Sequence, residues 1–179
     1  MAVHPQQRIE VVRTHLEMID RSALRPARLP EGPVRLVPRR GLDPQQYRTL
    51  YSDIGERWQW RDRLAWSDDE MAFYLASPDV HLFTLHLGEA TAGYFELLRH
   101  SDARVEIMYF GLAGAFIGRG LGGWMLTRAV EEAYALHATR VVLNTCTLDA
   151  PQALPNYLAR GFVIVREERY PVAVGASST

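Results

Sequence analysis

Apolar residues recur along this chain at two spacings, one typical of strands and one typical of helices. Alternating or continuous apolar stretches predict strands at 8–18, 34–37, 80–87, 92–98, 104–112, 140–145 and 162–169. Helices are expected at 44–53, 71–76, 121–137 and 150–160. In the longest helix the apolar stripe falls on Leu121, Met125, Ala129, Ala133 and Leu136, which is the pattern of an amphipathic helix.

Local signals indicate where two of these helices begin. Asp43 and Pro44 place an N-cap residue before a proline at the first helical position. Ser67 and Glu70 have the spacing of a capping box, in which each side chain bonds the backbone N–H of the other residue. Prolines and a glycine interrupt residues 20–33, which predicts a linker there.

The order of the elements predicts an α/β (α+β) fold, with a mixed, mostly antiparallel central sheet and flanking helices. Short turns join the three strands between residues 80 and 112 and make them antiparallel neighbours, whereas the later strands alternate with helices. We expect an N-terminal extension at 1–33, holding an extra strand and the linker, then a main domain at 34–170 and a flexible tail at 171–179.

Composition narrows the class of protein. Of the 179 residues, 47% are apolar and the formal net charge is −1, which predicts a sizeable core without the basic surface that binds nucleic acid or an anionic membrane. All 20 basic residues are arginine, so lysine-based chemistry is excluded. The single cysteine, Cys146, permits no internal disulfide, and no apolar run resembles a signal peptide or a membrane span. We therefore expect a cytoplasmic protein.

Four glycines lie at the start of the longest predicted helix, at Gly118, Gly120, Gly122 and Gly123. Glycine has no Cβ and tolerates positive φ, so the backbone can approach a ligand closely. A glycine-rich turn that opens a helix directs free N–H groups and the positive end of the helix dipole at one point. Because such a point suits a phosphate or pyrophosphate, the turn predicts a bound phosphorylated cofactor.

Two other interpretations of the turn compete with this one. Gly118-x-Gly120-x-x-Gly123 also matches the dinucleotide fingerprint, but residues 113–117 separate it from the preceding strand, and the following strand ends near Asn144 without a carboxylate. A purely structural turn without a ligand stays open, although it has to account for the conformational freedom that four glycines lose.

Two motifs in a fixed order carry a family resemblance. Gly120-x-Gly122 opens the long helix, and Tyr157-x-x-x-Gly161-Phe162 follows on the last predicted helix and strand. Together they resemble the GNAT superfamily of acyl-CoA-dependent N-acyltransferases, whose glycine motif is (Gln/Arg)-x-x-Gly-x-(Gly/Ala). Ile117 stands at the Gln/Arg position and removes one side-chain contact, but it leaves the backbone N–H groups in place. The resemblance covers residues 34–169, and the stretch 145–162 is also similar to one bacterial subgroup.

The resemblance implies that acetyl-CoA is the co-substrate. Its pyrophosphate would sit on the N–H groups of residues 118–123, and its pantetheine arm would lie between the strands at 104–112 and 140–145, which splay apart in the family. The arm would bond to the backbone of Phe110 and Leu112 as an added strand does. The residues expected to bind the cofactor are Phe110, Gly111, Leu112, Ile117, Gly118, Arg119, Gly120, Leu121, Gly122, Gly123, Asn144, Asp149 and Tyr157.

Acetyl transfer to an amine requires an acid, a base and an oxyanion donor. Tyr157 matches the family's tyrosine and is the candidate acid, because a phenol with a pKa of about 10 can protonate a leaving thiolate. Its alternative role is packing beside Leu154 and Leu158. A backbone N–H near Phe110 or Gly111 is the expected oxyanion donor.

Two carboxylates compete for the role of base. Glu106 lies among apolar neighbours on a predicted strand, so its partners need an explanation, and many GNAT proteins use a carboxylate on this strand, acting through water. Glu96 is the rival on the preceding strand, and the two are expected to share a face of the site. The alternative is that both are edge carboxylates bridged to Arg99 or Arg104.

Further side chains are expected to surround the acceptor or to have no chemical role. The aromatic residues Trp58, Trp60, Trp66, Tyr47 and Tyr51 either roof an acceptor pocket or pack in the core. We expect no metal site, because the histidines are scattered and lack ligand spacing with the cysteine.

The resulting hypothesis is an N-acetyltransferase that moves acetyl from acetyl-CoA to a primary amine by direct attack. The acceptor is a small-molecule or peptide amine that the sequence does not identify. The alternative hypothesis is a GNAT-like module that binds acyl-CoA as a sensor or structural partner without turnover. Dimers are common in the family, so a homodimer is among the expectations.

Overall fold

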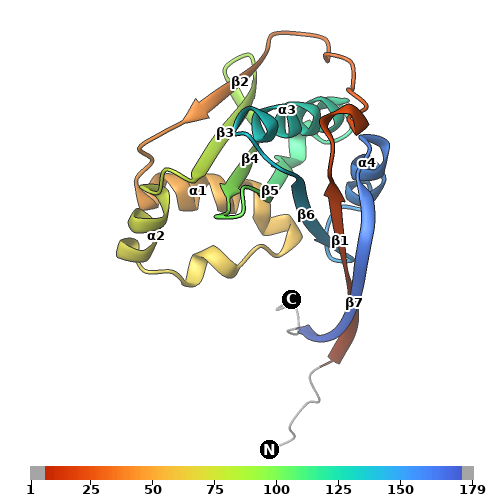
Figure 1. The fold of residues 1–179 in the computed structure, drawn as a ribbon. Coiled ribbons are helices and arrows are strands. Elements are labelled where there is room, and N and C mark those ends of the chain that lie inside the picture. Colours follow the sequence, from red (N-terminus) through yellow and green to blue (C-terminus); the bar gives the residue numbers. More distant parts are fainter. Residues whose placement is uncertain (1–6, 175–179) are drawn as a thin grey trace, which may run out of the picture.

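A seven-stranded sheet forms the frame of the protein (Figure 1). The computed structural model describes residues 7–174. The strands are β1 (Gln7–Met18), β2 (Val34–Arg39), β3 (Val80–Leu87), β4 (Ala90–Arg99), β5 (Val105–Leu112), β6 (Val141–Cys146) and β7 (Val163–Val174). Their order in the sheet is β2-β3-β4-β5-β6-β1-β7, and every neighbouring pair is antiparallel except β5 and β6. The predicted mixed, mostly antiparallel sheet is confirmed.

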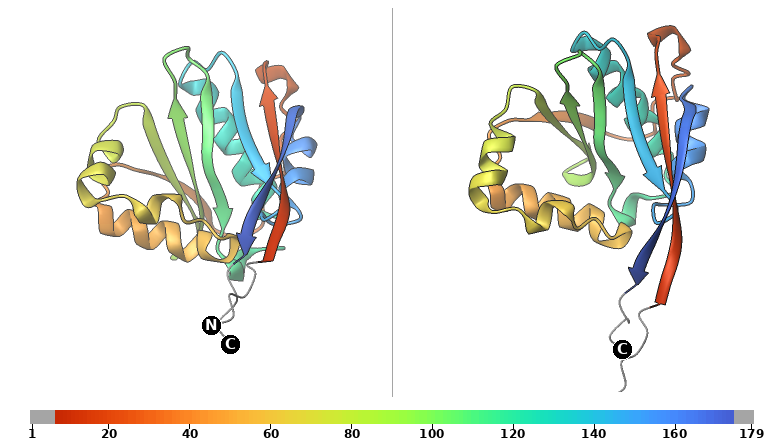
Figure 2. Two further views of the ribbon diagram at one scale, coloured as in Figure 1. Left: turned by 90° about the horizontal axis from the view of Figure 1, so that it is seen from below. Right: turned by 60° about the horizontal axis from the view of Figure 1, so that its bottom comes forward.

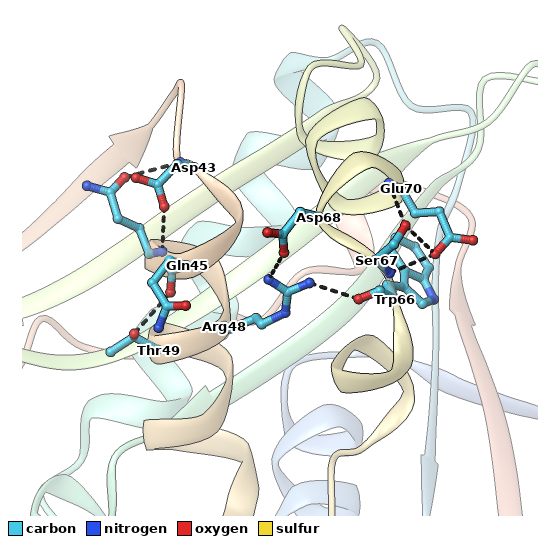
Figure 3. Close-up of polar contacts among 9 residues, drawn as sticks. Asp43, Gln45, Arg48, Thr49, Trp66, Ser67, Asp68 and Glu70 are labelled. Carbon is cyan, nitrogen blue, oxygen red and sulfur yellow. Dashed lines mark hydrogen bonds and ion pairs between the residues drawn. The ribbon is translucent and has the colours of Figure 1, made fainter.

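The described helices agree with the predicted ones to within a few residues. They are α1 (Pro44–Gly55), α2 (Asp68–Leu75), α3 (Leu121–Ala135) and α4 (Ala153–Ala159), with short 3-10 turns η1 (Arg21–Ala23), η2 (Glu56–Trp58), η3 (Asp62–Ala65) and η4 (Gly114–Phe116). Both predicted N-caps are confirmed: the Asp43 side chain accepts the Gln46 N–H at 2.8 Å, and Ser67 and Glu70 exchange both bonds of a capping box (Figure 3). None of these helices has the length and apolar content needed to cross a membrane.

Helices cover both faces of the sheet, so the protein has two apolar clusters (Figure 2). The larger cluster packs α3 and α4 against the sheet, with Met125 and Phe95 fully buried in it. The smaller cluster packs α1 and α2 against the other face, around Tyr47, Tyr51 and Tyr94. Burial of these side chains removes apolar surface from water, which stabilises the fold by about 25 cal/mol for each Å² buried. This burial holds the helices that border the site against the sheet.

The first described strand lies inside the sheet rather than at its margin. β1 pairs antiparallel with β6 on one side and with β7 on the other. The pattern at 8–18 therefore corresponds to an added strand, and the linker after it runs across α3, where the Ala27 N–H donates to Thr127 Oγ1 at 2.9 Å. This position brings β1 side chains next to the end of β6.

The last strand is longer than the apolar pattern predicts. β7 continues beyond Arg169 to Val174 and pairs with β1 as far as Gln7. Residues 171–174, expected as part of the flexible tail, are therefore strand, because β1 supplies backbone partners that no local pattern reveals. The rest of the expected tail, 175–179, and residues 1–6 lie outside the described residues.

The parallel ladder between β5 and β6 is short. Only Val105 with Val141 and Glu106 with Val142 are paired, and beyond them the two strands separate. Next to this point β5 carries a bulge: Glu96 of β4 faces Tyr109, whereas the following residue faces Ile107, so Met108 is the extra residue. A bulge bends a strand and increases its twist, which directs β5 away from β6. The predicted splayed strand pair is confirmed.

Candidate functional site

A cleft of about 510 Å³ opens where the β5–β6 ladder ends. Its walls come from β5, the end of β6, α4, the segment between α1 and α2, and the strands β1 and β7. The side chains and backbone that line it belong to Arg13, Trp58, Gln59, Trp60, Asp62, Glu106, Ile107, Met108, Tyr109, Phe110, Gly111, Leu112, Ile117, Gly122, Asn144, Cys146, Leu148, Asp149, Ala150, Gln152, Ala153, Asn156, Tyr157 and Tyr170. One gap in the sheet thus joins most of the residues predicted for the site.

The glycine turn stands at one end of this cleft and opens α3. Gly118 and Gly120 have φ of +80° and +73°, a left-handed conformation that glycine adopts without strain. Gly120 is the N-cap of α3 and offers no side-chain hydrogen bond, so the first N–H groups of the helix are left for a ligand. A Cβ on either glycine would meet nothing within 4 Å. The turn is therefore an open, uncapped helix start that fits a pyrophosphate.

The other residues of the turn have different surroundings. The Arg119 guanidinium lies over the Phe116 ring, 5.2 Å from its centroid. Leu121 is buried in the larger apolar cluster. A Cβ on Gly123 would approach Arg160 to 3.0 Å and Ala27 to 3.2 Å, so this glycine permits close packing, whereas Gly120 shapes the turn.

Substitution of Gly120 by alanine should weaken coenzyme A binding about 10-fold, because a left-handed residue with a Cβ costs roughly 1–2 kcal/mol and relaxes by turning the N–H groups. The matched change is Gly122→Ala, where φ is not positive and the new Cβ would sit 3.7 Å from its neighbours. It should cost far less. Titration calorimetry with coenzyme A measures both variants, and equal losses would contradict this assignment.

The β5 edge that faces the gap has free backbone groups. Phe110 and Leu112 pair with Phe95 and Gly93 of β4 on one side, while the β6 side has no ladder partner beyond Glu106 among the described residues. An extended ligand arm can therefore add to this edge as a strand does. Gly111, between them, is covered by Trp60, and a Cβ there would approach the indole to 3.0 Å.

Tyr157 extends from α4 into the cleft lining and retains 7% exposure. Its ring makes edge contacts with Phe110 and Phe162, at centroid distances of 6.1 and 6.2 Å. Burial, and next the charge of Asp149, raise the pKa of its phenol above the usual value of 10.0. The phenol therefore stays protonated at neutral pH, as a proton donor requires. Tyr157 therefore both packs against its neighbours and lines the cleft.

Glu106 lines the cleft from β5 and is held by His100. His100 Nε2 lies 2.8 Å from Glu106 Oε2, and Arg104 Nη2 lies 3.3 Å from His100 Nδ1. Because a guanidinium can only donate, Nδ1 must accept and the ring hydrogen must be on Nε2. Nε2 then donates to the Glu106 carboxyl group, so Oε2 is occupied by a protein partner.

Glu96 lies on the same face of the sheet but does not reach the cleft. It is fully buried under α1 and α2, where Tyr47 donates to Oε2 at 2.7 Å and Tyr74 and Arg63 donate to Oε1. Burial raises the pKa of Glu96, and Arg63, 3.1 Å away, opposes that rise. With both oxygens bonded inside the protein, Glu96 anchors η3 and α2 to the sheet, and of the two carboxylates predicted as base only Glu106 lines the cleft.

Asn144 lies near the end of β6, and Asp149 lies in the turn that follows it. The two side chains differ in their exposure and in their hydrogen bonds. Asn144 is exposed and lines the cleft. Asp149 also lines it, but its Oδ2 accepts from Thr145 Oγ1 at 2.6 Å and from the Cys146 N–H at 2.9 Å, so it holds the turn that follows β6. Burial raises the pKa of the Cys146 thiol, which keeps that side chain from acting as a thiolate.

Several cleft residues were not predicted from the sequence. Asn156 donates to the Gly122 carbonyl at 3.2 Å and connects α4 to the glycine turn. Its position one residue before Tyr157 is the feature of the sequence that could have indicated it as a cleft residue. Arg13 and Tyr170 come from β1 and β7, and no local signal places them here.

Of the aromatic residues expected to roof the acceptor pocket, Trp58 and Trp60 line the cleft. Tyr47 and Tyr51 are fully buried in the smaller cluster, and Trp66 packs against it. Among residues 7–174, no three His, Cys, Asp or Glu side chains are grouped so that they could hold a metal ion.

A comparison with known protein families shows to which family this chain belongs. The acetyltransferase (GNAT) family profile matches residues 47–162, from within α1 to the residue before β7. The chain belongs to the GNAT acetyltransferase family. Members of this family generally take the acetyl group from acetyl-CoA. No relative is found among curated proteins.

Solved structures share the fold at low sequence identity. A functionally unknown conserved protein from Staphylococcus epidermidis superposes with a TM-score of 0.63 at 15% identity, over 92% of this chain and 62% of that chain. A GCN5-related N-acetyltransferase from Sphaerobacter thermophilus gives 0.62 at 15%, over 93% and 53%. This chain therefore spans little more than half the length of these two proteins.

A shorter protein also has the fold. An aminoglycoside acetyltransferase from an uncultured soil metagenomic sample, solved in complex with trehalose, gives a TM-score of 0.58 at 12% identity, over 71% of this chain and 86% of that chain. At these identities the likeness concerns the fold and not the acceptor.

Proposed function

We propose that this protein is an N-acetyltransferase that moves acetyl from acetyl-CoA to a primary amine by direct attack. The observation that carries the proposal is a single cleft, opened by the end of the β5–β6 ladder, that holds Tyr157 and Glu106 and leads to the uncapped start of α3. The GNAT family assignment supports it.

Acetyl-CoA would supply the thioester whose carbonyl carbon the amine nitrogen attacks while the C–S bond breaks. Glu106 takes the amine proton, through water, because an ammonium has no lone pair to attack with. His100 occupies Oε2, so Oε1 is the oxygen left for that water. Tyr157 gives its phenolic proton to the departing thiolate and recovers one from solvent. Backbone N–H groups near Phe110 are the donors for the oxyanion.

Replacing Glu106 with glutamine should lower kcat/KM by at least 10-fold near neutral pH, since general base catalysis contributes about 10²–10⁴ and only part of it is lost when water can substitute. The deficit should shrink as the pH approaches the pKa of the acceptor amine, because free amine then forms without the enzyme. A pH profile of coenzyme A release measures this. Glu89→Gln, at a fully exposed turn residue, is the matched control. A loss of kcat/KM in Glu106→Gln that does not change with pH would contradict the role of Glu106 as the base.

Release of free thiol from acetyl-CoA, measured with a panel of amines, tests the proposed function itself. The panel contains amino acids, simple arylalkylamines, a short peptide and an aminoglycoside. Thiol release that depends on one of these acceptors supports the proposal. Tight coenzyme A binding without thiol release from any of them would favour the alternative, a non-catalytic acyl-CoA-binding module.

A further inference from the structure

The cleft lining carries charges of both signs. Its carboxylates are Glu106 from β5, Asp62 from η3 and Asp149 from the turn after β6, and its guanidinium is Arg13 from β1. Arg13 reaches this place only because β1 lies between β6 and β7. No residue of the family-matched segment 47–162 supplies a cation to this lining.

The strand register sets the separation of these charges. Arg13 pairs with Cys146, and Glu106 pairs with Val142, four residues earlier on β6. At about 3.3 Å per residue, the two backbone positions are roughly 13 Å apart along the strands, and the two strand spacings of about 4.8 Å across β6 bring their separation to roughly 16 Å. Both side chains are long and both line the cleft, with Asn144 between them. One small molecule can therefore contact Glu106 through water and Arg13 directly.

Arg13 is incompletely neutralised by the protein. Its Nη2 donates to the Tyr170 hydroxyl at 3.1 Å, and its carboxylate partner Glu168 is 3.7 Å from Nη1. Glu168 is shared, because His15 bonds it at 2.8 Å and Arg166 lies 3.9 Å away. Two arginines and a histidine thus surround one carboxylate, and Arg13 keeps 42% of its side chain exposed. Positive charge remains available in the cleft lining.

We propose that the acceptor is an amine that also carries a carboxylate, and that Arg13 binds that carboxylate while Glu106 receives the amine. This inference rests on the proposed function and names its substrate class. Arginine suits the role because its planar guanidinium can bond a carboxylate through two parallel N–H groups. Trp58, Trp60 and Tyr170 in the same lining provide aromatic surface for an apolar side chain. An aromatic amino acid combines all three features.

The test compares an amino acid with the amine that lacks its carboxylate. Tryptophan should have a kcat/KM at least 10-fold above that of tryptamine, since a hydrogen bond to a charged group contributes about 1.5–3 kcal/mol. Arg13→Gln should reduce this ratio about 10-fold, through the KM for tryptophan. Arg169→Gln, an exposed arginine of β7 paired with Glu10, is the matched control and should leave the ratio unchanged. Equal use of both compounds by the natural protein would overturn the inference.

A binding measurement separates this inference from the proposed function. N-acetyltryptophan titrated into the protein loaded with coenzyme A should bind, and Arg13→Gln should weaken that binding about 10-fold. If no amine releases thiol but this difference is present, the carboxylate site stands and the proposed reaction fails. If turnover occurs but Arg13→Gln changes neither the substrate ratio nor product binding, the reaction stands and the carboxylate site is wrong.

Discussion

Replacing Tyr157 with phenylalanine should lower kcat about 100-fold and leave coenzyme A binding nearly unchanged, because general acid catalysis contributes about 10²–10⁴. The change removes the proton that the departing thiolate needs. It keeps the ring, and so the edge contacts with Phe110 and Phe162 that fix this part of the cleft. Steady-state kinetics with a fixed acceptor, together with calorimetry using coenzyme A, separate the two effects.

The pH dependence of the natural protein gives a second test of Tyr157. Its neutral form is the active one, and burial raises its pKa, so Tyr157 causes no loss of activity below about pH 10.

Tyr134→Phe is the control for Tyr157→Phe. It also removes a phenol, one that donates to the Met18 carbonyl at 2.9 Å outside the cleft. Its kcat should stay within about twofold of the natural value, since any cost of about 1 kcal/mol falls on stability. An unchanged kcat in Tyr157→Phe would remove Tyr157 from the mechanism.

Replacing Arg63 with methionine should destabilise the protein by about 3–5 kcal/mol, because it leaves a buried carboxylate without its cation. Glu96 has no exposed surface, and Arg63 is 4% exposed. The guanidinium also lies against the rings of Trp66 and Tyr74, with 3.9 and 4.1 Å to their centroids, so its loss removes packing as well as charge. Chemical denaturation measures the change, and the melting temperature should fall by roughly 10 °C.

Two further variants identify charge burial as the cause. Arg169→Met breaks an ion pair whose partners are 64% and 63% exposed and should cost less than about 1 kcal/mol. Adding Glu96→Leu to Arg63→Met should restore part of the loss, since no buried charge then lacks a partner. A loss below about 1 kcal/mol for Arg63→Met alone would show that the pair contributes little.

The same ion pair positions part of the cleft. Arg63 belongs to η3 and directly follows the residues that form one wall, Trp58, Gln59, Trp60 and Asp62. Tyr47 and Tyr74 bring α1 and α2 to the same carboxylate. Glu96 therefore holds this wall of the cleft in place, although its own side chain does not line the cleft.

The two carboxylates show how far sequence reasoning extends at this site. Both Glu96 and Glu106 are charged residues among apolar neighbours on adjacent strands, and the prediction that they share a face agrees with the register. Whether a carboxylate is covered depends on helices distant in the chain, and here α1 and α2 cover Glu96 alone. The bulge at Met108, which helps to open the cleft, depends on the pairing of two strands and has no local signal.

By itself, the sequence determined the elements, the helix caps, the glycine turn and the position of Tyr157, because each follows from residues that are close together in the chain. The short turns also predicted that β3, β4 and β5 are neighbours, but only the tertiary structure decided the order of the other strands. The insertion of β1 between β6 and β7 brings Arg13 and Tyr170 to the cleft, and the two come from opposite ends of the chain. Strand order results from the joint burial of all faces of the sheet, and a local pattern contains no information about it.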